Sequence, residues 1–268
     1  MNRDAQTFST STPLIIGHRG ASALAPENTL VAFERALADG ADGVEFDVRL
    51  ARDRVPVVIH DATLRRTLLR DGLVADLTSA ELRHASAGLW FVHKHPDKAD
   101  HDFATAHVPT LDETLQLVGP RSAAVYIEMK CEAPAEYAPL AAAVVAHVRR
   151  HELVERAVVK CFAHDAIREV KRIAPDIRTA ALFDRTLSRP HITRRKIVAL
   201  AAACGADEIS LHRSLARPTV VEAALRHGFA VVTWTVDDPG WLARARGWGL
   251  RAVITNNPAA MRAALEDV

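Results

Sequence analysis

The sequence predicts a single (β/α)₈ barrel, the TIM-barrel fold class, with a small inserted subdomain after the second barrel strand and its return hairpin. Three observations lead there. The chain has 268 residues, of which 49% are hydrophobic, enough to bury a sizeable core. Short β-rich runs alternate with helical patterns along the chain. One pair of runs is too close together for a parallel crossover.

Nine short runs are rich in apolar and β-branched residues, as strands are. They lie at residues 14–17, 43–50, 55–60, 124–129, 157–161, 178–183, 207–211, 229–234 and 251–255. Most are separated by segments with helical periodicity, such as Leu30, Phe33 and Leu37, which follow Asn28 as a candidate N-cap. Prolines stand at four expected helix starts: Pro139, Pro218, Pro239 and Pro258.

The runs at 43–50 and 55–60 are separated by only a few residues, whereas a parallel crossover needs about a dozen or more. The second run must therefore return antiparallel to the first. The remaining eight runs give the strand count of a (β/α)₈ barrel. A hairpin that turns near residues 52 and 53 would also place His60 opposite Glu45 and Asp47.

Residues 61–110 are the largest departure from this alternation. Their segment "DLTSAEL" contains a capping box formed by Thr78 and Glu81. We expect an insertion over the barrel mouth, within one domain of residues 1–268. The histidine-rich stretch at residues 92–107 lacks the cysteines or helical spacing of zinc sites, which favours a solvated loop over a metal site.

Composition excludes several functional classes. The chain has 34 basic and 33 acidic residues, and its arginines are scattered, which argues against nucleic acid as a partner. No stretch approaches the roughly 18 apolar residues of a membrane span, and the N-terminus lacks a signal-peptide core. We therefore expect a cytoplasmic protein without an integral membrane segment. The three cysteines have no paired spacing, which indicates reduced thiols. The oligomeric state is not fixed by the sequence.

Two expected strands carry carboxylates on the face that would point into the barrel. In the run 43–50, apolar residues alternate with Glu45 and Asp47, so these acids would face the lumen. The run "AVYIEMK" places Glu128 and Lys130 inside in the same way. Three converging carboxylates suppress one another's ionisation unless positive charge lies among them. One divalent cation, Mg²⁺ or Ca²⁺ with Mn²⁺ also suited, would supply this charge. The alternative is a structural network in which they pair with Arg49, Arg19 and Lys130.

Two histidines flank this cluster. His18 and Arg19 follow the first strand, at the end on which barrel enzymes build their sites. His18 and His60 would form a general acid and base pair, since each can carry a proton near neutral pH. Arg19 and Lys130 would bind a phosphoryl group and stabilise the charge that develops on it.

The segments "HRGASALAPENT", "EFDVRLARDRVPVVIHD", "PTLDETL", "IEMK" and "TWTVDDP" occur in this order. Together they resemble the glycerophosphodiester phosphodiesterase family, from about residue 14 to residue 262. The resemblance implies a barrel that hydrolyses a glycerophosphodiester, a small-molecule substrate, to sn-glycerol 3-phosphate and an alcohol. Attack by the neighbouring glycerol hydroxyl or directly by water both remain open.

The resemblance also implies a role for each candidate residue. His18 and His60 would be the acid/base pair, and Arg19 and Lys130 would bind the phosphate. Trp234 would form a wall for the glycerol or its alcohol, although core packing accounts for it equally well. The expected ligands of Mg²⁺ or Ca²⁺ are Glu45, Asp47 and Glu128.

Two other functions remain open. A lysophospholipase D would need an apolar groove beside the site, which the segment "GLWFV" at residues 88–92 could line. A phosphate-binding barrel without turnover could use the same cluster as a sensor or scaffold. The preferred alcohol and the ion used are not fixed by the sequence.

Overall fold

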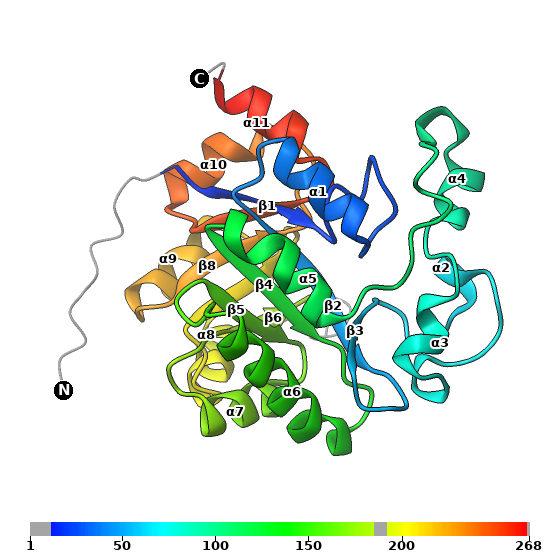
Figure 1. Cartoon of the computed structure of the whole chain (residues 1–268). Coiled ribbons are helices and arrows are strands. Elements are labelled where there is room, and N and C mark those ends of the chain that lie inside the picture. The colour runs from blue at the N-terminus through cyan, green and yellow to red at the C-terminus, as the bar shows by residue number, and fades with distance from the viewer. Residues whose placement is uncertain (1–11, 185–191, 267–268) are drawn as a thin grey trace.

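The computed structural model describes residues 12–184 and 192–266. Eight parallel strands form a closed barrel, because β1 pairs with both β2 and β9, and the predicted fold class is confirmed (Figure 1). The barrel strands are β1 (Leu14–His18), β2 (Gly43–Leu50), β4 (Ala124–Met129), β5 (Ala157–Cys161), β6 (Arg178–Phe183), β7 (Glu208–His212), β8 (Ala230–Trp234) and β9 (Ala252–Thr255). The short strand β3 (Pro56–Val58) returns antiparallel along β2, as predicted.

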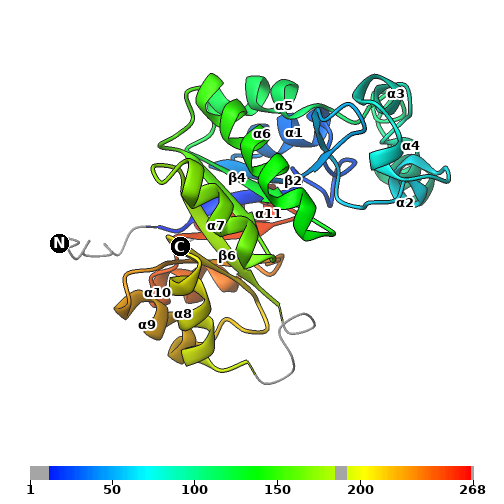
Figure 2. The same ribbon diagram turned by 90° about the horizontal axis from the view of Figure 1, so that it is seen from below.

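Helices pack around the outside of the barrel, as the two views in Figures 1 and 2 show. They are α1 (Leu30–Ala38), α5 (Leu111–Val118), α6 (Tyr137–Arg150), α7 (His164–Ile173), α8 (Arg194–Ala203), α9 (Pro218–Arg226), α10 (Trp241–Trp248) and α11 (Pro258–Glu266). Short 3₁₀ turns, η3 (Gly119–Arg121) and η4 (Pro134–Glu136), precede β4 and α6. Pro218 and Pro258 begin their helices as predicted, whereas Pro139 is the third residue of α6 and Pro239 precedes α10.

The N-cap predicted for α1 is wrong. Thr29, not Asn28, caps this helix, and its side chain accepts a hydrogen bond from the backbone N–H of Ala32. Asn28 has φ 59°, in the left-handed region that asparagine tolerates better than most residues. The turn before α1 therefore leaves the Asn28 side chain available for another contact.

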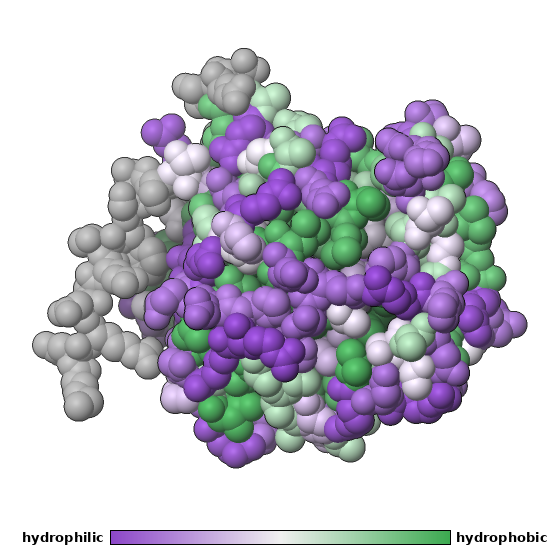
Figure 3. Space-filling model, viewed as in Figure 1, coloured by the Kyte–Doolittle hydropathy of each residue, from purple (hydrophilic) through white to green (hydrophobic). Residues whose placement is uncertain are grey.

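Residues between β3 and α5 form a lobe beside the barrel, at the right of Figure 1. It contains α2 (Arg65–Leu68), η1 (Val74–Asp76), α3 (Ser79–Arg83), α4 (Leu89–Lys94) and η2 (Pro96–Lys98). The predicted capping box of Thr78 and Glu81 is present at the start of α3. The lobe has a hydrophobic cluster of its own, built around Leu64, Leu82 and Val108. In the space-filling view, most of the visible face, lobe included, is hydrophilic, with scattered hydrophobic patches (Figure 3).

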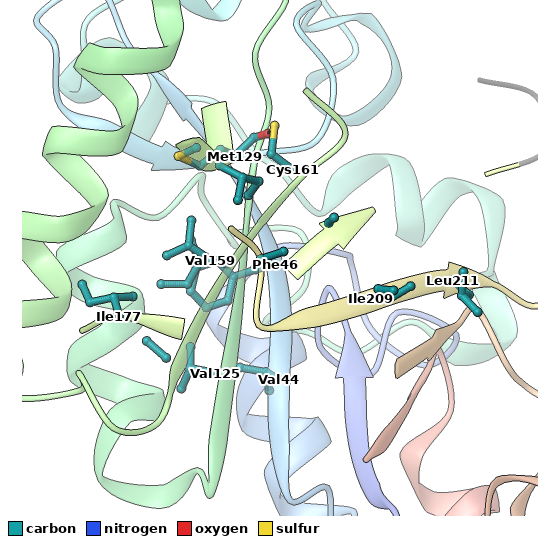
Figure 4. Close-up of a cluster of buried hydrophobic side chains, with 14 of the residues drawn as sticks. Val44, Phe46, Val125, Met129, Val159, Cys161, Ile177, Ile209 and Leu211 are labelled. Atoms are coloured by element: carbon teal, nitrogen blue, oxygen red, sulfur yellow. Dashed lines mark hydrogen bonds between the residues drawn. The ribbon is translucent and has the colours of Figure 1, made fainter. Parts of the chain in front are cut away.

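Strand alternation divides the buried residues into two sets. Val44 and Phe46 of β2 belong to the core between the sheet and the helices, together with Val125 and Val159 of neighbouring strands (Figure 4). A second cluster fills the barrel interior and includes Ile16, Tyr126, Val158, Val232 and Ile254. Residues that alternate with the outer set therefore point inward, as predicted for the acidic positions of β2 and β4.

Polar contacts lie inside the barrel near the amino ends of its strands. Tyr126 donates a hydrogen bond of 3.1 Å from its hydroxyl to Glu208 Oε2, and Arg251 Nε lies 3.1 Å from Glu208 Oε1. Burial raises the pKa of Glu208 above its ordinary value, although the Arg251 guanidinium acts against this rise.

In the described part of the chain, no helix is long and apolar enough to cross a membrane.

Gly43, at the start of β2, is required by the close approach of β4. A Cβ atom at this position would lie 1.9 Å from the carbonyl oxygen of Ala124. We predict that Gly43→Ala lowers the free energy of unfolding by about 1–3 kcal/mol, measured in urea, because the two strands must separate. Gly247→Ala is the matched control, since its Cβ would meet nothing within 4 Å, and it should leave stability unchanged or slightly increased. A Gly43→Ala variant as stable as wild type would contradict this strand pairing.

Candidate active site

Three carboxylates meet at the carboxyl end of the barrel strands. Glu45 and Asp47 extend from β2, and Glu128 extends from β4, where it is the direct register partner of Asp47. One ligand oxygen from each lies within 4.8 Å of the others, and all three residues are buried. The structure thus brings together the acidic residues that the sequence singled out.

Three cationic side chains hold this cluster. Lys130 Nζ lies 3.2 Å from Asp47 Oδ1 and also bonds to Glu128. Arg19 Nε lies 3.1 Å from Asp47 Oδ2. Lys160 Nζ lies 2.7 Å from Glu45 Oε1 and 3.5 Å from Glu128 Oε2. The site therefore contains as many cationic side chains as carboxylates.

The alternative prediction, a structural network in which the acidic residues pair with Arg49, Arg19 and Lys130, is wrong for Arg49. Arg49 does not contact the acidic cluster, because its guanidinium donates to the carbonyl of His60 and to Glu132. Lys160 takes its place, and sequence reasoning missed it. The signal was the alternation of β5, in which Val159 faces the helices and Lys160 faces the interior.

The surrounding charges keep Glu45 and Asp47 ionised. Burial acts to raise the pKa of Glu45, but the charges of Lys160 and His18 together outweigh it and hold this pKa below its ordinary value. Burial also acts to raise the pKa of Asp47, and Lys130 with Arg19 holds it well below the ordinary range. Both groups are therefore available as anionic oxygen ligands near neutral pH.

Asn28 belongs to the site and was missed from the sequence, where it was expected only to shape the start of the helix. Its Nδ2 donates a hydrogen bond of 2.9 Å to Asp47 Oδ2, and the backbone N–H of Asp47 donates to Asn28 Oδ1 at 3.3 Å. These reciprocal contacts fix the orientation of the Asp47 carboxylate. They depend on the positive φ of Asn28, which no sequence pattern revealed.

The two histidines are oriented by different partners. His18 Nδ1 donates to Asn256 Oδ1 at 2.7 Å, which leaves Nε2 directed towards Glu45 Oε2 at 3.9 Å. His60 Nδ1 donates to Asp61 Oδ1 at 2.5 Å, which leaves its Nε2 free to act. Burial lowers the pKa of His18 below its ordinary value, despite the opposing charge of Glu45. One imidazole is thus held by a neutral amide and the other by a carboxylate.

A series of ion pairs connects His60 to the loop that follows β1. Arg66 Nε lies 2.7 Å from Asp61 Oδ2, and the same guanidinium bonds to Glu27 at 2.7 Å. Glu27 in turn accepts a bond of 2.7 Å from Arg19. Burial opposes ionisation of Asp61, but its bonds from Arg66 and His60 prevail and lower its pKa to about 2. Asp61 therefore stays anionic.

A cavity of about 610 Å³ opens beside His18 and Arg19. Residues of the lobe, including Arg66, Trp90 and Lys94, form its other wall. The Trp90 ring is already flanked by two cations, because Arg66 Cζ lies 6.0 Å and Lys94 Nζ 5.9 Å from its centroid. The lobe thus completes a polar chamber next to the acidic cluster.

Trp234 lies at the end of β8 and packs edge-on against two rings. Its centroid is 5.7 Å from that of Phe162 and 5.2 Å from that of His212. Lys130 Nζ lies 5.9 Å from the centroid of Phe162. Trp234 is only partly buried, yet its Nε1 is shielded from solvent and has no hydrogen-bond partner. The Trp234 ring therefore packs within the barrel, near the carboxyl ends of the strands, where Lys130 also lies.

The donor set of the acidic cluster fits a hard divalent cation. Its candidate ligands are carboxylate oxygens alone, which suit Mg²⁺, Ca²⁺ or Mn²⁺ better than zinc. In the described part of the chain one other group of potential ligands occurs, at residues 100–102, and it is exposed. The histidine-rich stretch therefore gathers no buried ligand set there.

The side chains at this end of the barrel are those of an enzyme site. Ionised carboxylates, cationic side chains and two oriented imidazoles meet at the carboxyl ends of parallel barrel strands, where enzymes of this fold carry out their chemistry. The molecule is a (β/α)₈-barrel enzyme.

Comparison with known proteins identifies the family. Residues 18–260 match the model of the glycerophosphoryl diester phosphodiesterase family. A glycerophosphodiester phosphodiesterase of Caldanaerobacter subterraneus subsp. tengcongensis is 34% identical over 248 residues, covering 91% of this chain and 94% of the relative. The chain belongs to the glycerophosphoryl diester phosphodiesterase family and is a phosphoric diester hydrolase.

Solved structures agree. A glycerophosphodiester phosphodiesterase from Agrobacterium tumefaciens has a TM-score of 0.76 and 30% identity, covering 94% of this chain and 99% of that one. A phosphodiesterase from Oleispira antarctica, solved in complex with the product sn-glycerol-3-phosphate, has a TM-score of 0.83 and 26% identity, covering 98% of this chain and 99% of that one.

The contacts of Asn28 predict a specific loss of stability. Asn28→Gly removes both bonds to Asp47 while keeping a residue suited to positive φ, and we expect it to cost about 1–3 kcal/mol in the free energy of unfolding. Asn28→Ala should cost about 1 kcal/mol more, because alanine is strained at φ 59°. Urea unfolding of both variants measures this difference. A glycine variant as stable as wild type would show that the paired bonds contribute nothing.

Proposed function

We propose that this enzyme hydrolyses glycerophosphodiesters to sn-glycerol 3-phosphate and an alcohol, with a divalent cation and two histidines. The observation that carries the proposal is the set of three buried carboxylates within 4.8 Å of one another, with His18 Nε2 3.9 Å from Glu45 and His60 near enough for its charge to act on Asp47. Family membership and the product bound to the Oleispira antarctica neighbour support a glycerophosphodiester as the substrate.

The metal ligands are proposed to be Glu45, Asp47 and Glu128. When bound there, Mg²⁺, Ca²⁺ or Mn²⁺ would act as a Lewis acid that polarises a phosphoryl oxygen. The carboxylate set does not choose among these ions.

Arg19 and Lys130 are proposed to bind the phosphate. Both contact Asp47 and stay partly exposed, with side-chain exposures of 18% and 14%, which supports a role in binding substrate. Burial acts to lower the pKa of Lys130, but Asp47 and Glu128 raise it above its ordinary value, so the side chain stays cationic. Their charges would stabilise the negative charge that develops on the phosphoryl oxygens in the transition state.

The two imidazoles are suited to different proton transfers. His18 Nδ1 is bonded to an uncharged amide, so its Nε2 is available as a proton acceptor, and we assign it as the general base. His60 Nδ1 is bonded to the Asp61 carboxylate, which orients the ring, and we assign His60 as the general acid for the departing alcohol. Either the glycerol hydroxyl or a water molecule could give its proton to His18.

The chamber beside His18 fits a polar leaving alcohol. Apart from Ala23, Leu69 and Trp90, the residues that line it are polar or charged. Of the segment "GLWFV", Trp90 lines the chamber, whereas Phe91 is buried in the lobe. This lining favours a water-soluble diester over a lysophospholipid. We also infer that residues 61–110 act as an insertion that walls the mouth, and that Trp234 contacts the glycerol moiety.

A panel of glycerophosphodiesters, assayed with and without chelator, tests the function. We expect release of sn-glycerol 3-phosphate from glycerophosphocholine and its analogues, loss of activity with chelator, and recovery with Mg²⁺ or Ca²⁺. Faster release of choline from lysophosphatidylcholine would instead support a lysophospholipase D. Binding of sn-glycerol 3-phosphate without hydrolysis of any diester would support a non-catalytic barrel.

Loss of either histidine should reduce turnover without unfolding the barrel. We predict that His18→Ala and His60→Ala each lower kcat by roughly 10²–10⁴-fold, the usual contribution of general acid or base catalysis. His95→Ala is the matched control, because His95 lines the same chamber but its ring packs on Phe91, and it should keep most of the activity. Near-normal turnover in either of the first two variants would remove that histidine from the mechanism.

A further inference from the structure

We propose that Lys160 is an internal counter-ion of the acidic cluster, which competes with the divalent cation for Glu45 and Glu128 and so sets the affinity of the site for metal. The inference rests on the metal site proposed above. It assigns to Lys160 a role that neither phosphate binding nor proton transfer requires.

The position of Lys160 restricts what it can contact. It lies on β5 as the register partner of Glu128, and its side chain is only 2% exposed. Both of its ion pairs are with the candidate ligands, at 2.7 Å from Glu45 Oε1 and 3.5 Å from Glu128 Oε2. Its ammonium therefore lies against carboxylate oxygens of two of the three candidate ligands.

Lys160 differs in this respect from the other two cations. Arg19 also pairs with Glu27, outside the cluster, and its side chain is 18% exposed. Lys130 is 14% exposed and lines a second cavity. These two can meet a substrate, whereas Lys160 is enclosed by the barrel. The ion pairs of Lys160 are with Glu45 and Glu128.

The charges of the cluster indicate the direction of the effect. Three carboxylates are balanced by Arg19, Lys130 and Lys160, so the metal-free site is close to neutral. A bound dication adds two positive charges beside the Lys160 ammonium, and that repulsion weakens metal binding. Without Lys160, the carboxylates would lose a counter-ion in the metal-free state and attract the dication more strongly.

An anionic ligand should offset part of the excess charge. We therefore expect metal and sn-glycerol 3-phosphate to strengthen each other's binding, by the same factor in both directions. Removing Lys160 lowers the positive charge of the metal-bound site, so this mutual strengthening should become smaller.

Calcium titration of the chelator-treated full chain tests the inference. Calorimetry should show that Lys160→Met binds Ca²⁺ tighter than wild type by on the order of ten-fold or more. Its metal-free Tm should be lower, and saturating Ca²⁺ should raise that Tm by more than it raises the Tm of wild type. Lys160→Arg, which keeps the charge, should stay close to the wild-type affinity.

Lys171→Met is the matched control. Lys171 lies 2.6 Å from Asp207 in another partly buried pair, outside the acidic cluster. Its replacement should lower stability without changing the affinity for Ca²⁺. A similar gain in affinity in this control would show that the effect is not specific to Lys160.

Unchanged or weaker Ca²⁺ binding by Lys160→Met would overturn the inference. If Lys160→Met does not fold, the metal-free wild type provides the test. Lys160 should keep the wild-type chain folded after chelation. Unfolding of the chelated wild type would contradict the inference. Wild-type hydrolysis of glycerophosphocholine is measured in parallel. Intact metal-dependent hydrolysis with no effect of Lys160→Met refutes the role of Lys160 alone, whereas absence of hydrolysis refutes the proposed function.

Discussion

Burial of three carboxylates at one end of a barrel is the constraint on which the rest of the site depends. Without cationic partners, buried carboxylates this close together would take up protons, because burial and mutual repulsion both disfavour their charged forms. Arg19, Lys130 and Lys160 make the charged forms stable. The cationic residues around the cluster therefore serve the fold as well as the chemistry.

The barrel supplies the geometry that this electrostatic balance needs. Parallel pairing of β2 and β4 sets Asp47 beside Glu128, and the antiparallel return of β3 leads the chain back to His60. The loop after β1 adds His18 and Arg19 at the same end. Segments distant in sequence thus meet because strand ends coincide, and the ion pairs of Arg66 join the lobe to that first loop.

Strand positions and the inward acids could be predicted because they follow from a local period of two, and the return hairpin because its connection is too short for a parallel crossover. Lys160 could have been found by the same rule but was overlooked, since a single inward lysine in an apolar strand gives a weak pattern. Contacts such as Asn28 with Asp47 and His18 with Asn256 could not be predicted. They depend on a positive φ and on the meeting of the first and last strands, and neither leaves a trace in local periodicity.

We propose that the three carboxylates converge because they share a divalent cation. A crystal structure of the protein grown with calcium tests this most directly. We expect one ion bonded to an oxygen from each of Glu45, Asp47 and Glu128, at about 2.3–2.6 Å. A site without an ion at saturating calcium, in which Lys130 still bridges Asp47 and Glu128, would contradict it.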